Sequence, residues 1–492
     1  MQLSESIIDN LEPEVNLQYP SRENLKLPEK VLQFGTGALL RGLPDYFFDK
    51  ANRKNIFNGR VVMVKSTNQG SIQDLIAQNN LYTLCVRGIE DDKEIKENYL
   101  NSATSRILIA KNQWQEVLDC ASNEDLKIVV SNTTEVGIQL MDDNIHDAPP
   151  KSFPGKLLAF LYARYEAFSG DESKGLVIIP TELIIDNGDK LKEILVLLAQ
   201  QNELEEEFIQ WLKNCNHFCN SLVDRIVPGA PDEKEKKALK KELGYCDQYM
   251  IKAEPYRLWA IEAKEKKVRD ILSFAEVDKG VILADDISKY RTLKIRLLNG
   301  THTFSCALAY LSGLDTVREA MMDEDMGDFI QDLMDEIINT ISGEDISRRE
   351  ARIFANEVAD RFRNPFNIHK WLSISVQYTS KVKMRNVPLI INYSKKFRAV
   401  PKAMAKGLAA YILFMCSEKQ PDGTFVGTRE KENYPIKDDL SGKLYDLWKQ
   451  DPNDPVEAIL SDVSLWGTDL TKINGLVNSV RKHVFQCLKA HH

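Results

Sequence analysis

Hydrophobic positions in the first half of the chain form short, uninterrupted runs separated by amphipathic stretches. The runs cover residues 31–34, 60–65, 126–130 and 176–180. Strands that are apolar on both faces are typical of a parallel sheet covered by helices on each side. The helical spacing of the segments between them, as in residues 156–167, predicts crossover helices. We therefore expect a doubly wound, Rossmann-like α/β domain over residues 1–287.

The pattern changes at about residue 288, where apolar residues begin to recur at three- and four-residue spacing. This spacing holds over residues 316–342, 347–361 and 399–415, with almost no β-rich run. Residues 420–455 contain several Pro, Gly and Asp residues, which indicates a surface excursion. The second half therefore predicts an all-helical domain over residues 288–492.

The composition and charge of the chain argue against nucleic acid and membrane as partners. The chain has 492 residues, of which 28% are charged and 43% hydrophobic, as in ordinary globular proteins. Its formal net charge is −9 and it has no strongly basic block, so we expect no nucleic acid and no membrane as a partner. There is no signal-peptide pattern and no apolar run long enough to span a bilayer. We expect a soluble, cytoplasmic protein that is a monomer or a small homo-oligomer.

The cysteines give little sign of a metal site. The chain has 8 cysteines and no CxxC pair, and the closest spacing is that of Cys215 and Cys219, with His217 between them. A zinc site needs more ligands at suitable spacing, and only Cys246 is near in sequence. We therefore expect no metal and interpret the cysteines as reduced thiols.

A glycine-rich turn follows the first apolar run, in VLQFGTGALLRG. Gly35 permits a tight turn after a strand, and Gly37 leaves room for a pyrophosphate near the start of a helix. The third glycine of GxGxxG is absent, since Leu40 takes its place. The pattern favours a dinucleotide site, although a turn that simply needs glycine gives the same sequence. The residues expected to contact the cofactor here are Gln33, Phe34, Gly35, Thr36, Gly37, Ala38, Leu39 and Arg41.

Further cofactor contacts are expected where neighbouring strands end. Ser66 and Thr67 follow the second run, and Asn132, Thr133 and Glu135 follow the third. Ligands of doubly wound sheets bind outside the carboxyl ends of the strands. The second run does not end in the acidic residue that often holds the ribose in NAD enzymes, so the choice between NAD and NADP is left open. Helix capping would explain SNTTEVG equally well.

The strongest chemical signal is the segment YRTLKIRLLNGTHTFSCALAYL. Lys294, Asn299 and His302 interrupt its helical apolar pattern and fall within one broad face of an α-helix. Such a trio suits carbonyl reduction, because the amine can supply a proton and the amide can stabilise the developing oxyanion. The imidazole can orient the substrate. In the structural alternative, Lys294 reaches solvent and His302 is an ordinary core residue.

Five segments together carry a family resemblance: FGTGALLR, SNTTEVG, VDRIVPG, EPYRLW and KIRLLNGTH. Their types and order resemble the polyol-specific long-chain dehydrogenases, the mannitol dehydrogenase family. IIPTELIIDNGD, NSLVDRIVPG and RFRNPFNIHKWLSIS are similar to the branch that interconverts D-tagaturonate and D-altronate. The resemblance implies an NAD-linked, metal-independent reduction of the keto acid in galacturonate breakdown. It also implies that Lys294 is the general acid/base and that Asn299 and His302 bind the reacting oxygen region.

The sequence departs from the mannitol-type pattern at two places. Glu182 stands where that pattern has the asparagine of a Cys-Asp-Asn triplet that completes the oxyanion site. Either Asn187 has taken the amide role, or Glu182 holds substrate hydroxyls. The second departure is Arg291, which stands where an acidic residue precedes the lysine by three. A cation here suits an anionic sugar acid better than a neutral polyol.

A sugar acid needs a partner for its carboxylate. Arg385 in KMRNVP occupies the position of a substrate-binding arginine in the family, and Arg363 in RFRNP is a second candidate. A guanidinium can bind a carboxylate through two parallel hydrogen bonds. Rival hypotheses are the same chemistry on fructuronate, mannonate or a mannitol-type polyol, and a dinucleotide-binding sensor that has lost catalysis.

Overall fold

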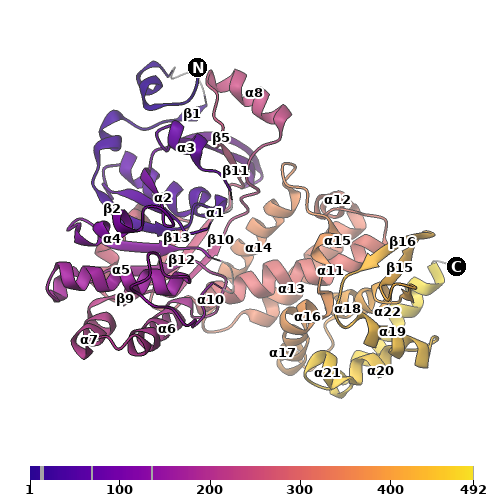
Figure 1. Ribbon diagram of the computed structural model, residues 1–492. Coiled ribbons are helices and arrows are strands. Elements are labelled where there is room, and N and C mark those ends of the chain that lie inside the picture. The colour runs from indigo at the N-terminus through magenta and orange to yellow at the C-terminus, as the bar shows by residue number, and fades with distance from the viewer. Residues whose placement is uncertain (12–15, 68–69, 134–136, 491–492) are drawn as a thin grey trace. The chain divides into compact units, whose positions relative to one another are not determined.

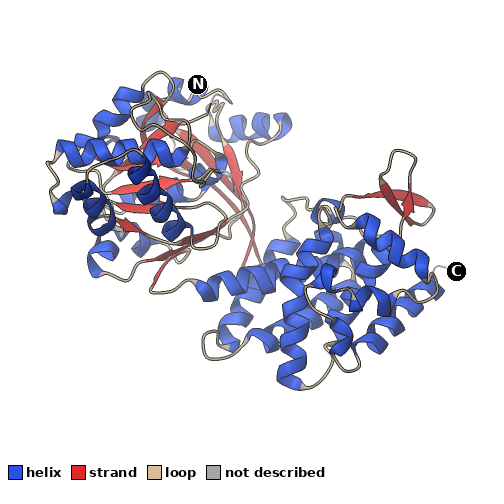
Figure 2. Cartoon of the chain, turned by 60° about the horizontal axis from the view of Figure 1, so that its bottom comes forward, coloured by secondary structure: helices blue, strands red, loops and turns tan. Residues whose placement is uncertain are grey.

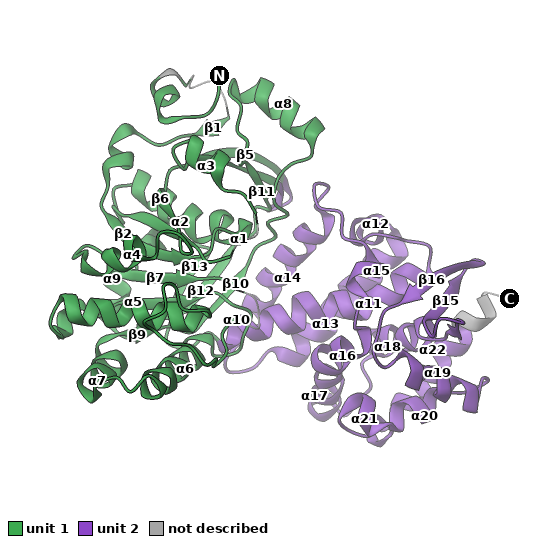
Figure 3. Ribbon diagram, in the orientation of Figure 1, with its two compact units in different colours: residues 1–87, 94–287 green, residues 88–93, 288–492 purple. Residues whose placement is uncertain are grey.

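The computed structural model describes residues 1–11, 16–67, 70–133 and 137–490 and divides into two compact units (Figure 3). Unit 1 comprises Met1–Arg87 and Glu94–Ile287, and unit 2 comprises Gly88–Lys93 and Ser288–His492. Within the described part of the chain, no helix is both long enough and apolar enough to cross a membrane.

Unit 1 comes first along the chain and is coloured mainly indigo to magenta in Figure 1. It is built on a six-stranded parallel sheet in the order β6-β3-β2-β7-β8-β9. The strands are β2 (Glu29–Phe34), β3 (Arg60–Lys65), β6 (Thr104–Ile109), β7 (Ile128–Ser131), β8 (Val177–Pro180) and β9 (His217–Phe218). From β2 the chain first builds outward to β3 and β6, then returns and builds in the other direction from β7. The order reverses between β2 and β7, which is where doubly wound folds bind their ligands. This confirms the predicted Rossmann-like class.

The continuous apolar runs are explained by two cores, one on each face of the sheet. Val31 packs on one face with α1 (Ala38–Gly42) and α2 (Pro44–Arg53). Its neighbour Leu32 points to the other face. That second face is covered by α4 (Trp114–Asp119), α5 (Phe153–Ala167), α6 (Asn187–Gln201) and α7 (Glu206–Cys215). A strand between two cores has no polar face, so its sequence does not alternate.

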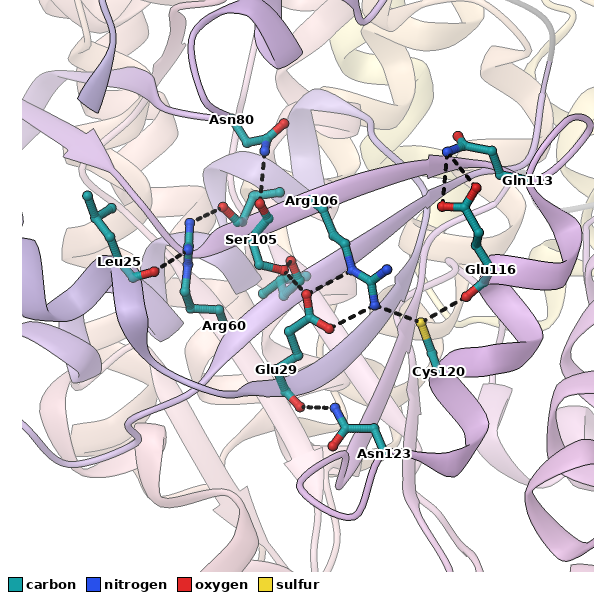
Figure 4. A network of polar contacts seen from close by, with 12 residues as sticks. Leu25, Glu29, Arg60, Asn80, Ser105, Arg106, Gln113, Glu116, Cys120 and Asn123 are labelled. Carbon is teal, nitrogen blue, oxygen red and sulfur yellow. Dashed lines mark hydrogen bonds and ion pairs between the residues drawn. The ribbon is translucent and has the colours of Figure 1, made fainter. Parts of the chain in front are cut away.

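A polar network holds the amino ends of the strands together (Figure 4). Arg106 on β6 donates through Nε and Nη2 to the two carboxylate oxygens of Glu29 on β2, at 2.9 and 3.0 Å. Ser105 Oγ donates to Glu29 at 2.8 Å, and Arg106 Nη2 also lies 3.4 Å from Cys120 Sγ. The network therefore lies at the amino ends of the strands, and the glycine turn lies at the opposite, carboxyl end of β2.

Two further sheets belong to unit 1 except at Gly88–Lys93, where β4 ends and β5 begins within the residues assigned to unit 2. The sequence pattern did not predict these sheets. One has the order β1-β5-β4-β11 and the other β10-β12-β13. Their strands are β1 (Leu17–Gln18), β4 (Tyr82–Glu90), β5 (Lys93–Asn101), β10 (Ser221–Asp224), β11 (Ile251–Ala253), β12 (Leu258–Glu262) and β13 (Val281–Ala284). The remaining helices of unit 1 are α3 (Gln73–Ala77), α8 (Glu233–Leu243) and α9 (Lys266–Ile271).

Unit 2 consists largely of helices, as predicted (Figure 2). They are α10 (Ser288–Thr292), α11 (Gly300–Leu311), α12 (Val317–Met322), α13 (Glu324–Ile341), α14 (Arg348–Arg363), α15 (Trp371–Ile374), α16 (Tyr378–Lys381), α17 (Val387–Phe397), α18 (Lys402–Phe414), α19 (Ser441–Gln450), α20 (Val456–Ser461), α21 (Val463–Trp466) and α22 (Leu476–Ala490). Two π-helical segments, Leu293–Asn299 and Val382–Asn386, lead directly into α11 and α17.

The expectation of an all-helical second domain needs one correction. Unit 2 also contains a small antiparallel sheet of β14 (Glu418–Lys419), β15 (Phe425–Arg429) and β16 (Glu432–Ile436). The surface excursion predicted over residues 420–455 is therefore ordered. Tyr434 explains this, because its ring packs 4.7 Å from that of Phe414 and its hydroxyl donates to the Phe414 carbonyl at 2.8 Å.

Candidate active site

The glycine turn lies at the carboxyl end of β2, in the middle of the parallel sheet. Gly35 has a φ of +130°, and a Cβ added there would lie 2.8 Å from Leu40 Cδ1 and 3.2 Å from the Asn132 carbonyl oxygen. The backbone therefore requires glycine at this position. Leu40, which replaces the third glycine of the usual motif, is buried beneath the turn.

Gly37 differs from Gly35 because its backbone does not require glycine. Its φ is −66°, and among the described residues no atom beyond its immediate chain neighbours and the adjoining helix backbone lies within 4 Å of a Cβ added there. The residue is exposed and precedes the first turn of α1. An open position at this place is what the pyrophosphate of a dinucleotide needs, since a side chain would obstruct its approach to the backbone. The residues of the turn therefore fit a dinucleotide.

Three residues predicted to contact the cofactor support the turn from inside the protein. Gln33 is buried, and its Nε2 donates to the Gly35 carbonyl at 3.2 Å. Arg41 Nε donates to the Thr36 carbonyl at 3.2 Å, and Phe34 belongs to the core below the sheet. The other predicted residues of the turn are partly or fully exposed: Gly35, Thr36, Gly37, Ala38 and Leu39.

The neighbouring strand ends carry the remaining predicted cofactor contacts. Ser66 Oγ after β3 is buried and has no hydrogen-bond partner among the described residues, whereas Thr67 is exposed. Asn132 Nδ2 after β7 donates to Thr181 Oγ1 at 2.9 Å. Glu135 lies outside the described residues. Ser66 therefore carries a buried hydroxyl that a ligand could satisfy.

Glu182 lies buried after β8 and joins the ends of β7 and β8. Its Oε1 accepts hydrogen bonds from the Thr133 backbone N–H at 2.8 Å and from Thr133 Oγ1 at 3.0 Å, and its Oε2 accepts one from Ser131 Oγ at 3.1 Å. Burial raises the pKa of Glu182, and these hydrogen bonds oppose the rise.

Asn187, the alternative candidate for the oxyanion site, is fully buried at the start of α6. Its Nδ2 lies within hydrogen-bond distance of three carbonyl oxygens, those of Pro180 (3.0 Å), Glu182 (3.0 Å) and Ser221 (3.1 Å). Its Oδ1 accepts from the Ser221 backbone N–H at 2.9 Å. No amide hydrogen is left for a substrate oxygen, so this side chain positions the loop that carries Glu182.

In unit 2, Lys294 and Asn299 lie on the π-helical segment Leu293–Asn299. The sequence-based expectation assumed α-helical spacing, which sets residues five apart at about 140° around the axis. Hydrogen bonding from residue i to i+5 instead brings residues five apart close to one another, and such segments are frequent at functional sites. The π-helix therefore sets the backbone positions of Lys294 and Asn299 closer together around the axis than α-helical spacing would. Asn299 lines the pocket described next, and Lys294 is not among the residues that line it.

A pocket of about 360 Å³ opens beside this segment, within unit 2. It is lined by Asn299, His302, Ile368, His369, Lys370, Ser373, Ile374, Lys381 and Arg385. These lining residues include three cations and two imidazoles but no carboxylate. A small concave site with this charge favours an anionic ligand.

Arg385 is held in this pocket by the second π-helical segment. Its Nη1 donates to Thr303 Oγ1 at 3.2 Å, and Arg296 Nη1 donates to the Arg385 carbonyl at 2.8 Å. Arg363, the other predicted carboxylate partner, pairs with Asp360 and Asp92 at 2.7 Å each. Arg363 does not line the pocket, and its charge is balanced by these two carboxylates.

His302 is enclosed by aromatic rings. Its ring stacks on Phe362 at 4.1 Å and lies 6.1 Å from Trp371. Burial lowers the pKa of His302 far below its usual value, and His369, Arg361 and Arg385 lower that pKa further. The imidazole is therefore neutral, and its buried Nε2 has no hydrogen-bond partner among the described residues. A substrate oxygen can fill that position.

Comparison with known proteins decides the family. Residues 29–272 match the family model of the mannitol dehydrogenase Rossmann domain, and residues 286–488 match that of the mannitol dehydrogenase C-terminal domain. The chain belongs to the mannitol dehydrogenase family. It is accordingly an oxidoreductase that acts on a secondary alcohol.

Individual members of the mannitol dehydrogenase family are similar along nearly the whole chain. The altronate oxidoreductase of Halalkalibacterium halodurans is 39% identical over 466 residues, which cover 92% of this chain and 90% of that protein. The altronate oxidoreductase of Bacillus subtilis is 37% identical over 460 residues, covering 92% and 91%.

Solved structures share the fold. Pseudomonas fluorescens mannitol 2-dehydrogenase, in a ternary complex with NAD and D-mannitol, gives a TM-score of 0.68 at 22% identity and covers 100% of this chain and 97% of its own. D-sorbitol dehydrogenase gives 0.74 at 19% identity, covering 98% and 100%.

Sequence reasoning missed six residues of the pocket: the basic residues His369, Lys370 and Lys381, and also Ile368, Ser373 and Ile374. His369 and Lys370 lie in RFRNPFNIHKWLSIS, a segment that carries the family resemblance and whose Arg363 was the predicted carboxylate partner. Lys381 precedes Arg385 by four residues, a spacing that puts two cations on one side of a helix. Over the described residues, no three potential metal ligands lie together.

Proposed function

We propose that this enzyme catalyses the reversible reduction of D-tagaturonate to D-altronate with NADH. The observation that supports this most is the pocket of unit 2, where Lys370, Lys381 and Arg385 line a space without any carboxylate beside Asn299 and His302. A hexuronate brings a carboxylate for these cations, whereas a neutral polyol does not. The altronate oxidoreductases among the relatives are consistent with this substrate class.

In this proposal the glycine turn of unit 1 binds the cofactor and the pocket of unit 2 binds the sugar acid. When bound, the reduced nicotinamide supplies a hydride to the keto carbon. Lys294 donates a proton to the carbonyl oxygen as negative charge develops there, and the Asn299 amide donates a hydrogen bond to the same oxygen. His302 orients the substrate through its unused nitrogen, and Arg385 binds the carboxylate. In the reverse direction Lys294 acts as the base.

Reduction of D-fructuronate to D-mannonate is the second candidate. The same pocket supports it, because that keto acid carries the same carboxylate and differs from D-tagaturonate in configuration only. The choice of cofactor is also part of the test. β3 ends at Lys65 and is followed by Ser66 and Thr67, so no acidic side chain stands there to repel the phosphate of NADPH.

The decisive experiment follows the absorbance of the reduced cofactor with purified protein. It measures the rate at which D-tagaturonate, D-fructuronate and D-fructose are reduced with NADH and with NADPH. We expect rapid turnover of D-tagaturonate with NADH and little with the uncharged ketose. Lys294→Ala should lower kcat by roughly 10²- to 10⁴-fold while NADH binding is retained.

The matched control is Lys237→Ala, on the exposed side of α8, which should leave kcat unchanged. Undiminished turnover by Lys294→Ala would disprove the acid/base role. Equal turnover of D-fructose and the uronates would disprove the sugar acid assignment.

A further inference from the structure

His369 lines the same pocket as His302, and the mechanism above gives it no role. It lies between α14 and α15, on a backbone that is fixed from two sides. The His369 carbonyl accepts a hydrogen bond from the Val317 backbone N–H at 2.9 Å, and Lys370 forms a β-bridge with Thr316. The next residue, Trp371, is completely buried. The imidazole is therefore presented to the pocket from a well-anchored segment.

The side chain of His369 is half-buried and has its hydrogen-bonding capacity unused. Its ring centroid lies 6.2 Å from that of His302, with the ring planes at 65°. Among the hydrogen bonds of the described residues, none involves its ring nitrogens, and the half-buried ring leaves them open to a ligand. Burial lowers the pKa of His369, and the nearby Arg361 lowers it further, so the ring is neutral. A neutral imidazole offers one donor and one acceptor.

We propose that His369 is a specificity-determining residue that recognises the hydroxyl two carbons away from the substrate carbonyl. This inference rests on the proposed function, since it takes the substrate to be a ketohexuronate. The separation of the two rings lets His302 bind near the reacting oxygen while His369 binds an oxygen further along the same chain.

The two candidate substrates differ at the carbon whose hydroxyl His369 is proposed to recognise. D-tagaturonate and D-fructuronate differ only in configuration at the carbon two positions from the carbonyl. Only one epimer can direct its hydroxyl toward His369 while the carbonyl and carboxylate ends stay in place. A site that offers a hydrogen bond to a particular hydroxyl rejects a substrate that leaves this bond unmade.

The test compares kcat/KM for D-tagaturonate and D-fructuronate in wild type, His369→Leu and His369→Gln. We expect wild type to prefer D-tagaturonate and His369→Leu to lower that preference at least about tenfold, mainly through the preferred substrate. His369→Gln retains an amide donor and acceptor, so it should restore part of the preference. The matched controls are His146→Leu and His146→Gln, made at an exposed histidine of unit 1.

The outcomes separate the inference from the proposed function. A merely structural role for His369 would lower kcat/KM for both uronates equally, and an unchanged ratio would overturn the inference alone. A wild type that reduces both epimers equally would also overturn it. If wild type reduces neither uronate, the proposed function falls and the inference falls with it. NADH binding, which the proposal places in unit 1, and the melting temperature show that each variant is folded.

Discussion

At the level of single residues, the surroundings of Arg385 leave its charge available for an anionic ligand. It is partly buried in the pocket of unit 2, where none of the lining residues is a carboxylate. Burial lowers the pKa of Arg385, yet a guanidinium stays charged throughout the working pH range. A buried cation without a counter-charge in the same pocket has a strong affinity for an anionic ligand.

We therefore predict that Arg385→Ala raises KM for a uronate by about 10- to 100-fold, the loss of a charge-assisted hydrogen bond. The KM for an uncharged ketose should change much less. Steady-state kinetics on both substrates checks this. Arg363→Ala provides the comparison, since Arg363 already pairs with Asp360 and Asp92 and should leave both KM values unchanged. If Arg363→Ala alone raises the uronate KM, the carboxylate role passes to Arg363.

At the scale of the element, the turn after β2 separates two uses of glycine. Gly35→Ala introduces a Cβ at a φ of +130° with main chain 3.2 Å away, so it strains the backbone. Gly37→Ala introduces a Cβ into open space at an ordinary φ of −66°. We predict that Gly35→Ala lowers both the melting temperature and NADH affinity, whereas Gly37→Ala lowers NADH affinity only.

Fluorescence titration with NADH and thermal unfolding of both variants measure this difference. We expect each variant to lose tenfold or more in NADH affinity. In Gly37→Ala the new methyl group would occupy the path of the pyrophosphate, and in Gly35→Ala the strained backbone would distort the turn. Unchanged NADH affinity in Gly37→Ala would refute the cofactor role of the turn, whatever Gly35→Ala does.

The sequence predicted the strands whose two faces are both buried, and it did not predict strands that are partly exposed and polar. The strands at residues 31–34 and 60–65 were predictable because both faces are buried, which leaves an uninterrupted apolar run. The strand β5 was not, since its first half is largely exposed and polar. The candidate site followed the same division. Residue types and spacing suggested Lys294, Asn299 and His302, and the family resemblance suggested Arg385. Of these, Asn299, His302 and Arg385 line the pocket, whereas nothing in KIRLLNGTH marks a π-helix.

At the scale of the whole molecule, a buried acid links stability to pH. Asp45 is completely buried on α2 beneath the glycine turn, and Gln33 Nε2 donates to it at 3.4 Å. Burial raises the pKa of Asp45 to about 7. The folded protein then holds a proton that the unfolded chain has lost. The stability that this proton contributes is fully present at low pH and is lost as the pH rises through 7.

We predict that wild type loses roughly 1 kcal/mol of unfolding free energy between pH 6 and 8 through this group. Asp45→Asn is neutral at every pH and should lack this loss. Urea unfolding at both pH values measures the difference, with Asp74→Asn on the exposed side of α3 as the matched control. Parallel pH profiles for wild type and Asp45→Asn would show that the acid is already ionised in the folded state.

The π-helical segment Leu293–Asn299 also constrains how the protein can change during evolution. A π-turn accommodates one residue more than the α-turn that it replaces. Deleting one residue between Lys294 and Asn299 would let the segment return to α-helical bonding with the two residues four apart, at about 40° around the axis, so they would stay on one side. A return to α-helical bonding at unchanged length would set them about 140° apart. We therefore expect a relative that lacks the π-turn to be one residue shorter between these two positions.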